Sequence, residues 1–438
     1  IVLRGNTPLK LRHWYQGNLT TALQGLPVDS FMYVWTTAPK RVWIKLSGSI
    51  NDAPLKLAYE RFAIIVNANQ IQRNTCTIRN LRIEGYSNVA LTSRLQANTT
   101  IEDCDINYVG GERDINAGTW YGQGIALGAA CSGSIVRRCN INWVYDSPVT
   151  MELYHGNNSI TDGWEISDCT LSEAGLAAVN LSTQLSDFQT IRNGKVFRNS
   201  VNNIGKDFCS WLPEGSNNGL GAAVWILGNA ATAGTSTITD TVVKGNIARI
   251  CRSFASVFPK GTASNTFAGT VAINTNVQGQ DFLLAPHQSA ETINLAGNVV
   301  QKFVTAINAA GQSGALALNV RNNTFVGNGS VLSKGTGVTA TLQNNLVQNN
   351  TTVVSGAAGT VSSNYNYFSG NGTDGTFTRG ANDVAGAAVT FRAGTDLVPV
   401  DTALVWAGGT SWTSNSAADV NTNPFGVPAW SRNGYAKI

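Results

Sequence analysis

One pattern occurs three times between residues 98 and 181: TTIEDCDINYVGGERDINAGTWYGQGIAL (99–127), SIVRRCNINWVYDSPVTMEL (134–153) and WEISDCTLSEAGLAAVNL (164–181). In each copy an alternating strand carries a cysteine, a polar loop follows, and a second strand begins, which we place at Gly124, Pro148 and Gly175. Loops of unequal length leave the strands in register, so the strands form a common scaffold. Repeats of this size predict a solenoid whose coils pack on their neighbours.

A column of cysteine and asparagine extends this register beyond the three copies. Cys104, Cys139 and Cys169 take one place in the repeat. The same place is taken by Asn80, Asn199, Asn246, Asn276, Asn298, Asn323, Asn345 and Asn364. Asparagine tolerates left-handed backbone, and stacked amides can hydrogen-bond along the axis as a ladder. The shortest steps, about 22 residues, fit one coil of three short strands, so we predict an all-β parallel β-helix.

The composition agrees with this fold and excludes several classes of protein. A chain of 438 residues is long for one compact domain but ordinary for a solenoid, and only 13% of it is charged. The net charge of +4 includes no run of Lys or Arg, so nucleic-acid binding has no support. No apolar segment approaches the roughly 20 residues of a membrane span. The sequence starts at Ile1 without an initiator Met or signal peptide, so we expect a processed or truncated piece.

The cysteines and histidines indicate no metal site and no bound cofactor. Seven cysteines is an odd number, so at least one thiol is free. Parallel side chains in a column do not aim their sulfurs at one another, so the three repeat cysteines should be buried thiols, with Cys131, Cys209 and Cys251 left open. There is no CxxC spacing, and the three histidines are scattered along the chain.

We expect three segments along the chain. Residues 1–70 should form an N-terminal β cap, with FMYVW (31–35) and RVWIKL (41–46) as a hairpin. Residues 71–368 should form the β-helix, with long insertions at 108–121 and 204–220 that leave the same corner. Residues 369–438 should form a C-terminal cap or an oligomer contact. Both caps would cover coil ends, which are unpaired sheet edges.

The coil pattern resembles the right-handed parallel β-helix proteins of the pectate-lyase-like superfamily. YVGGERDINAGTWYGQGI and the following IVRRCNINWVYDSPVT are similar to a signature, roughly GG…YGNGIE then VYDxxxT, of such proteins. The resemblance spans about residues 30 to 370 and implies a single-stranded right-handed parallel β-helix. The superfamily includes polysaccharide lyases, glycoside hydrolases, epimerases and phage tailspikes, which implies an extracellular or virion location. The chain departs from the signature at Gln123, where Asn is usual, and at Ala126, where Glu is usual.

One corner of the coils collects the candidate catalytic residues. Our alignment of the second strands makes Gly122, Asp146 and Glu173 equivalent on successive coils, which would place Asp146 and Glu173 about 5 Å apart. Two carboxylates that close repel, so one should keep its proton and serve as an acid. Glu152 should point outward onto the same face and is the reserve candidate. Asp207, in the long loop below, is a fourth catalytic candidate.

The two long loops should flank this corner and form a carbohydrate cleft. The candidate substrate-binding residues are Glu112, Asp114, Trp120, Tyr121, Tyr145, Lys206, Trp211, Glu214 and Arg252. Aromatic faces stack on sugar rings, and paired carboxylates suit glycoside hydrolysis. A lyase would instead use Lys206 or an arginine as the base, with carboxylates holding a cation such as Ca²⁺.

Simpler structural roles compete with these assignments. A single acidic residue at a β-helix corner is more often a solvated loop residue than a catalyst. Arg137 and Arg138 should form exterior ion pairs with Glu102 and Asp103, since all four alternate with core positions. Three tryptophans look like packing residues rather than sugar platforms: Trp143, Trp164 and Trp225.

Two functions remain. The one we favour is a polysaccharide-degrading enzyme, by glycoside hydrolysis or β-elimination, either free or mounted on a phage tail. The alternative is a non-catalytic receptor-binding or structural module, which the missing glutamate at Ala126 supports. In either case the expected partner is a polysaccharide or cell-surface glycan, and a homotrimer would fit a tailspike.

Overall fold

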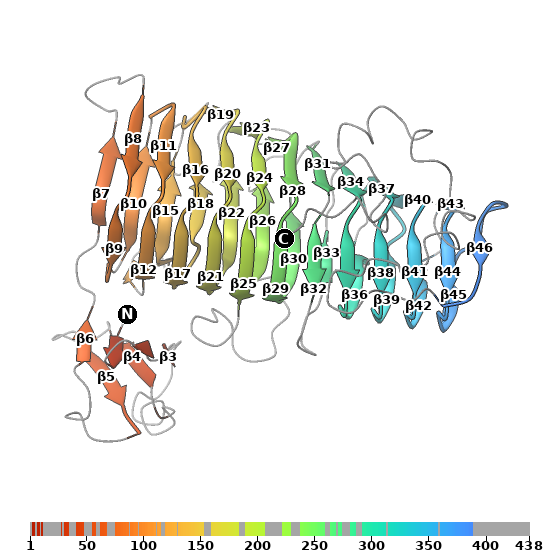
Figure 1. Ribbon diagram of the computed structural model, residues 1–438, viewed down its shortest axis with the longest axis horizontal. Helices are drawn as coiled ribbons and strands as arrows, with labels where there is room; N and C mark the ends of the chain where they lie inside the picture. Colours follow the sequence, from red (N-terminus) through yellow and green to blue (C-terminus); the bar gives the residue numbers. More distant parts are fainter. Residues whose placement is uncertain are drawn as a thin grey trace.

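Three long parallel sheets, joined coil by coil, form a solenoid in the computed structural model of this protein (Figure 1). Sheet 1 has 12 strands, sheet 2 has 11 and sheet 3 has 12. The chain visits the three sheets in turn, and neighbouring strands within each sheet come from successive coils. This is a right-handed parallel β-helix, as the sequence predicts. All the regular elements in the part of the chain that the structure describes are β-strands.

Sheet 1 comprises β7 (Phe62–Asn67), β10 (Val89–Arg94), β15 (Gln123–Leu127), β18 (Val149–Glu152), β22 (Ala177–Thr183), β26 (Ala222–Gly228), β30 (Ser253–Phe258), β33 (Asp281–Leu284), β36 (Thr305–Ala309), β39 (Ser330–Lys334), β42 (Thr352–Gly356) and β45 (Thr373–Gly375). Sheet 2 comprises β8 (Cys76–Arg79), β11 (Thr99–Glu102), β16 (Ile135–Arg137), β20 (Glu165–Ser167), β24 (Lys195–Phe197), β28 (Thr241–Lys244), β31 (Ala263–Ala268), β34 (Glu291–Ala296), β37 (Leu316–Arg321), β40 (Val338–Gln343) and β43 (Val361–Asn364). Sheet 3 comprises β9 (Arg82–Glu84), β12 (Asp105–Val109), β17 (Asn140–Val144), β21 (Thr170–Ala174), β25 (Ser200–Ile204), β29 (Ile247–Cys251), β32 (Val271–Ile273), β35 (Val299–Gln301), β38 (Thr324–Val326), β41 (Leu346–Gln348), β44 (Tyr367–Ser369) and β46 (Val384–Ala385).

Smaller sheets accompany the solenoid. A parallel sheet of β19 (Ile160–Asp162), β23 (Thr190–Arg192) and β27 (Thr237–Thr239) lies beside it, and β13 (Glu112–Asp114) and β14 (Thr119–Tyr121) form an antiparallel hairpin. The N-terminal strands are β1 (Val2–Arg4), β2 (Thr7–Pro8), β3 (Lys10–Leu11), β4 (Ser30–Val34), β5 (Arg41–Lys45) and β6 (Leu55–Leu57). The structure describes residues 2–4, 7–8, 10–11, 28, 30–34, 41–47, 55–57, 62–67, 75–86, 88–94, 96–110, 112–114, 119–128, 130–152, 159–183, 189–205, 221–228, 237–258, 263–268, 270–273, 281–285, 291–311, 314–357 and 360–388.

An inward column of cysteine and asparagine runs along the solenoid between sheets 2 and 3, as the repeats predict. Cys139 and Cys169 lie on adjacent coils, and the backbone N–H of Cys139 points at the Cys169 Sγ at 3.5 Å. Asn345 shows how an amide fills the same place. Its Oδ1 accepts from the backbone N–H of Asn323 at 2.9 Å, and its Nδ2 donates to the Val320 carbonyl at 2.9 Å. Each rung therefore ties one coil to the next.

Two predicted rungs of this ladder are wrong, and a third lies outside the described residues. Leu81, not Asn80, lies opposite Cys104, since Arg82 pairs with Asp105. Asn276 lies outside the described residues, and Thr270 occupies its rung, because the Thr270 N–H donates to Asn298 Oδ1. Asn366, not Asn364, accepts from the Asn345 N–H at 2.9 Å.

The left-handed residue that we assigned to the ladder position instead comes one residue earlier. Asp103, Arg138 and Asp168 have φ values of 55°, 52° and 54° and directly precede the three column cysteines. Asn80 belongs to this set, with φ 58°. A left-handed turn there lets the next side chain point into the core, so asparagine serves at two adjacent positions for two different reasons.

A second left-handed residue lies at or near the end of most of the described strands of sheet 3. Tyr108 and Trp143 are examples, with φ values of 59° and 56°. The turn sends two successive side chains outward before the chain re-enters the core, which explains why Asn107 and Tyr108 are both half-buried while Val109 is buried. This conformation costs a residue other than glycine about 1–2 kcal/mol.

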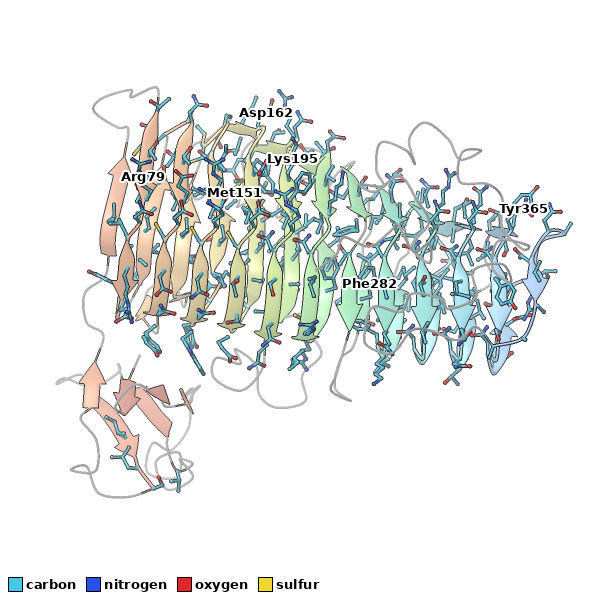
Figure 2. All side chains as sticks on the ribbon, viewed as in Figure 1. Arg79, Met151, Asp162, Lys195, Phe282 and Tyr365 are labelled. Carbon is cyan, nitrogen blue, oxygen red and sulfur yellow. The ribbon has the colours of Figure 1, made fainter. Side chains whose placement is uncertain are left out.

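The core is apolar and continuous along the coils, and most of the described charged side chains are not buried. Met151 and Phe282 are buried side chains, whereas Lys195 is exposed (Figure 2). Six cysteines are described and all are free thiols, and Cys104, Cys139 and Cys169 are buried as predicted. The exterior ion pairs are also confirmed: Glu102 accepts from Arg137 and Arg138, and Arg138 pairs with Asp103.

The ends of the solenoid differ in part from the expected boundaries. The predicted hairpin is present as β4 and β5. The N-terminal strands β1 to β6 lie outside the stacked coils, near the N-terminal end of the solenoid (Figure 1). Strand β7 already pairs with β10, so the coils begin before residue 71. Strands β45 and β46 lie beyond residue 368, and Asp383 adds a rung by accepting from the Asn366 N–H. The capping roles of residues 1–70 and 369–438 stay predictions.

Candidate functional site

A cluster of buried polar side chains lies where the chain passes from sheet 3 into sheet 1. Its two carboxyl groups belong to Asp146, in the turn before β18, and to Glu152, at the end of β18. Gln123, the first residue of β15 on the preceding coil, contacts both. Its Nε2 lies 3.3 Å from Asp146 Oδ2 and 3.3 Å from Glu152 Oε2. One amide group therefore bridges the two acids.

The strand register explains why these residues meet. Val149 pairs with Ile125, so Asp146 lies beside Gly122 and Ser147 lies beside Gln123. Gly122 has no room for a side chain there, because a Cβ would come within 2.6 Å of the Tyr145 Cβ. On the other side, Asn180 of β22 donates to Glu152 Oε1 at 2.8 Å.

Burial controls the protonation of the cluster. Asp146 is only 3% exposed, and this loss of solvent raises its pKa to about 7, against the opposing effect of hydrogen bonds from Ser147 and Gln123. Ser147 Oγ donates to Asp146 Oδ1 at 3.0 Å. Asp146 can therefore hold a proton near neutral pH, which an ordinary aspartic acid cannot do.

The two acids are close enough to act on one bond. Because each oxygen lies 3.3 Å from the same nitrogen, the two oxygens cannot be farther apart than twice that distance. Retaining glycosidases hold their carboxyl groups about 5–5.5 Å apart, and inverting enzymes about 6.5–9.5 Å. The limit covers the retaining range and reaches only the lower end of the inverting range.

The predicted pairing of Asp146 with Glu173 is wrong. Val144 pairs with Ala174, so Glu173 lies beside Trp143, and the residue beside Asp146 on the next coil is Leu176. Glu173 is the left-handed residue of its strand, with φ 54°, and accepts from Asn203 Nδ2 at 2.6 Å. Our alignment shifted the third copy by three residues, because it matched Gly175 to Pro148.

The remaining candidate site residues fall into four groups. Tyr145 is 1% exposed and packs in the core, so it cannot offer a face to a sugar. Arg252 is half-buried in the column of Asp146 but three coils away, about 14 Å along the axis. Glu112, Asp114, Trp120 and Tyr121 lie in the hairpin β13–β14, whose backbone enters β15 just before Gln123. Lys206, Asp207, Trp211 and Glu214 lie outside the described residues.

Three residues of the site were not predicted from the sequence. Gln123 and Asn180 hold the acids, and Trp225 lies beside Asn180 on the outer face of sheet 1, half-buried. Ala126 and Thr150 share this outward column, so the position where the signature has Glu lies beside the cluster. Thr150 follows Cys139 by as many residues as Asn180 follows Cys169, so counting from the cysteines would have placed Asn180 beside Thr150.

Hydroxyl groups face this part of sheet 1 without a described partner. Thr92 and Thr150 are 1% and 0% exposed, and the Oγ1 of each makes no hydrogen bond within the described part of the protein. They lie in one outward column, on either side of Ala126. A buried hydroxyl of this kind is costly unless something accepts from it or donates to it.

The described residues include no group of three or more His, Cys, Asp or Glu side chains that could hold a metal ion. The expected use of Ca²⁺ by a lyase stays a prediction. Among the same residues there is no helix long and apolar enough to span a membrane.

No family model and no curated protein matches the sequence. Among solved structures, the chain is similar to a PL6-family alginate lyase, with 9% identity over 80% of this chain and 56% of the lyase and a TM-score of 0.35. It is also similar to the tailspike protein of E. coli bacteriophage HK620, solved with a pentasaccharide, with 12% identity over 75% and 56% of the two chains and a TM-score of 0.33. A third similar structure is tailspike gp49 of Acinetobacter baumannii bacteriophage Fri1, a capsular polysaccharide depolymerase, with 11% identity over 77% and 68% and a TM-score of 0.25.

The chain thus spans little more than half the length of the first two of these proteins. Its fold follows from its own strand order, in which three sheets of 11 or 12 parallel strands are visited in turn. By that architecture, the chain has the right-handed parallel β-helix fold.

Proposed function

We propose that this protein binds a polysaccharide over the outer face of sheet 1 and hydrolyses it with Asp146 and Glu152. The observation that carries the proposal is the bridging amide of Gln123, which holds two buried carboxyl groups at one point. Paired carboxyl groups in unlike environments are the usual equipment of glycoside hydrolysis.

Asp146 is the acid in this proposal. Burial raises its pKa to about 7, so it carries a proton at neutral pH and can donate it to the oxygen of the glycosidic bond as that bond breaks. Ser147 and Gln123 fix the direction of the carboxyl group through both of its oxygens. A rigid support of this kind is needed to place a proton within about 0.5 Å of its target.

Glu152 is the second carboxyl group, which attacks the sugar carbon or activates a water. Gln123 and Asn180 both donate to it, which orients it. Direct attack would retain the configuration at the sugar, and activation of a water would invert it.

Sugar binding would use the outward column of sheet 1. Thr92 and Thr150 offer buried hydroxyls, and Trp225 adds an aromatic face one strand beyond Asn180. Such a mixture of aromatic and polar groups is typical of sugar sites. A glycan substrate agrees with an extracellular or virion location, and the homotrimer stays a prediction.

One observation favours the non-catalytic alternative. Asp146 and Glu152 are 3% and 9% exposed, so a glycosidic bond reaches them only if neighbouring groups move aside. If they do not move, the cluster is a structural network, and the protein is a binding module.

A cleavage assay on a panel of extracellular and capsular polysaccharides tests the proposal. New reducing ends without an unsaturated product would indicate hydrolysis, and ultraviolet absorbance of an unsaturated uronate would indicate elimination. Asp146→Asn and Glu152→Gln should each lower the rate about 10²–10⁴-fold. The matched controls are Asp168→Asn, in an exposed ion pair with Arg198, and Glu165→Gln on sheet 2, which should cleave at the parent rate. Parent-like cleavage by both site variants would refute the assignment.

A further inference from the structure

A left-handed residue comes at or just after the end of most of the described strands of sheet 3. In the downstream coils that residue is Lys302, Gly327, Asn349 or Gly370, with φ values of 61°, 65°, 55° and 59°. Glycine and asparagine adopt this conformation most easily, so three of these four choices serve the backbone. The position therefore has no intrinsic need for a large side chain.

The upstream coils fill the same position very differently. Gly85 holds it on the first coil, with φ 80°, and on the coils that follow it is held by Tyr108, Trp143, Glu173, Asn203 and Ile250, with φ values between 51° and 59°. Aromatic and β-branched residues are poorly suited to left-handed backbone. Strain of this kind is typically retained where the side chain has a function, so the two aromatic residues call for a reason beyond folding.

Tyr108 and Trp143 form a paired aromatic surface on the outside of sheet 3. They lie side by side on adjacent coils, because Asn107 pairs with Asn142 and Val109 with Val144. Their rings stack with centroids 6.5 Å apart and planes at 22°, and both residues are half-buried. At that separation the two rings overlap only in part, which leaves ring surface for another group.

Polar groups border this aromatic pair. Asn142 Nδ2 donates to Asn107 Oδ1 at 3.3 Å in the adjacent outward column, and Ser172 donates to Asn142 Oδ1. Along the axis, Glu173 and Asn203 continue the column of the rings, joined by a 2.6 Å hydrogen bond. Ring faces edged by amides and a carboxylate match a sugar, which has apolar C–H faces and hydroxyl edges.

We propose that Tyr108 and Trp143 form a second sugar-binding subsite, which holds the same glycan beside the Asp146–Glu152 cluster. The proposal rests on the function proposed above and names where the chain of sugars continues. Trp143 precedes Asp146 by three residues, a span of at most about 11 Å, so one oligosaccharide can touch both. The subsite then runs along the solenoid axis over successive coils, about 4.8 Å apart.

Asparagine substitutions separate this role from a structural one. Trp143→Asn and Tyr108→Asn remove the rings, but asparagine already occupies this turn at Asn203 and Asn349. The variants should therefore melt at or above the parent temperature. Binding is measured by affinity electrophoresis of the full chain in gels containing alginate, polygalacturonate, hyaluronan, xanthan or a neutral glucan. The polysaccharide that retains the parent should bind each variant at least tenfold more weakly, and Trp143→Phe should restore most of the binding.

The outcomes distinguish this subsite from the catalytic proposal. If both asparagine variants are retained like the parent, or if they unfold instead of keeping the parent melting temperature, the subsite is refuted. If they lose binding while Asp146→Asn still cleaves, the subsite stands and the catalytic assignment fails. If Asp146→Asn abolishes cleavage but Trp143→Asn and Tyr108→Asn keep the parent KM, the catalytic assignment stands and the subsite is refuted. A parent that none of the five gels retains overturns both.

Discussion

Replacing Asn345 by alanine should weaken the solenoid far more than an asparagine-to-alanine change on its surface. Asn345 is 2% exposed, and its side chain is one rung of the inward ladder. Its Oδ1 accepts from the Asn323 N–H at 2.9 Å and from Asn323 Nδ2 at 3.1 Å. Its Nδ2 donates to the Val320 carbonyl at 2.9 Å and to Asn366 Oδ1 at 2.8 Å.

The loss of stability depends on which hydrogen-bond partners of Asn345 keep another partner after the substitution. Asn323 Nδ2 still donates to Leu295 and Arg321 carbonyls after the substitution, and Asn366 Oδ1 still accepts from the Asn345 N–H. The buried Asn323 N–H loses the acceptor that Asn345 provides. One unsatisfied buried group costs about 1–3 kcal/mol, and the lost bond to the Val320 carbonyl adds roughly 0.5–1.5 kcal/mol, since Asn323 Nδ2 and Asn366 Oδ1 keep other partners. We therefore expect the free energy of unfolding to fall by about 2–4 kcal/mol.

Urea unfolding followed by circular dichroism measures this change, with Asn319→Ala as the matched control. Asn319 lies on the outer face of the same coils and makes a 2.8 Å bond to Asn294 Oδ1, so its loss should cost under about 1 kcal/mol. Hydrogen exchange should also speed up at the Asn323 amide in Asn345→Ala alone. If the two variants unfold at the same urea concentration, the ladder does not stabilise the fold as we describe.

Two further predictions concern stability. Burial raises the pKa of Asp281 from 3.8 to about 7 and that of Glu291 from 4.5 to about 8, so both stabilise the fold fully below about pH 4 and lose this contribution as the pH rises through 7 to 8. The urea midpoint of unfolding should therefore fall between pH 5 and pH 9, and Glu291→Gln should reduce that fall. A Glu291→Gln variant whose midpoint depends on pH as the parent's does would refute the prediction. Gly205→Ala should cost at least about 3 kcal/mol of stability in thermal unfolding, since φ is 73° and a Cβ would lie 2.2 Å from the Gly221 Cα. Gly163→Ala, with φ 69° and open space around the residue, should cost about 1 kcal/mol in the same measurement. Equal costs for the two variants would contradict this account.

The sequence predicted the fold well because the repeats report on the backbone. A buried column has to be filled once per coil, so Cys139 and Cys169 mark their coils whatever the loops between them do. The exact rung was harder to place where two candidates adjoin, as at Asn364 and Asn366. Thr270 shows a further limit of the prediction from sequence, because a threonine on a rung cannot be recognised by a pattern of asparagine and cysteine.

The site was predicted less well because side-chain reach does not appear in a repeat pattern. Asp146 and Glu152 were both identified, yet they were not paired, since Gln123 on another coil brings them together. The error over Glu173 could have been avoided. Cys139 to Val149 and Cys169 to Val179 are both ten residues, and that constant spacing places Leu176 beside Asp146.

The most direct test of the central claim compares the turnover of one polysaccharide by Asp146→Asn and by Asp168→Asn. Both changes convert an aspartate to asparagine on the solenoid, but only the first alters a buried acid bridged to Glu152. We predict that Asp146→Asn binds the polysaccharide like the parent and cleaves it at least about 100-fold more slowly, while Asp168→Asn keeps the parent rate. Equal turnover by the two variants would show that catalysis does not occur at Asp146.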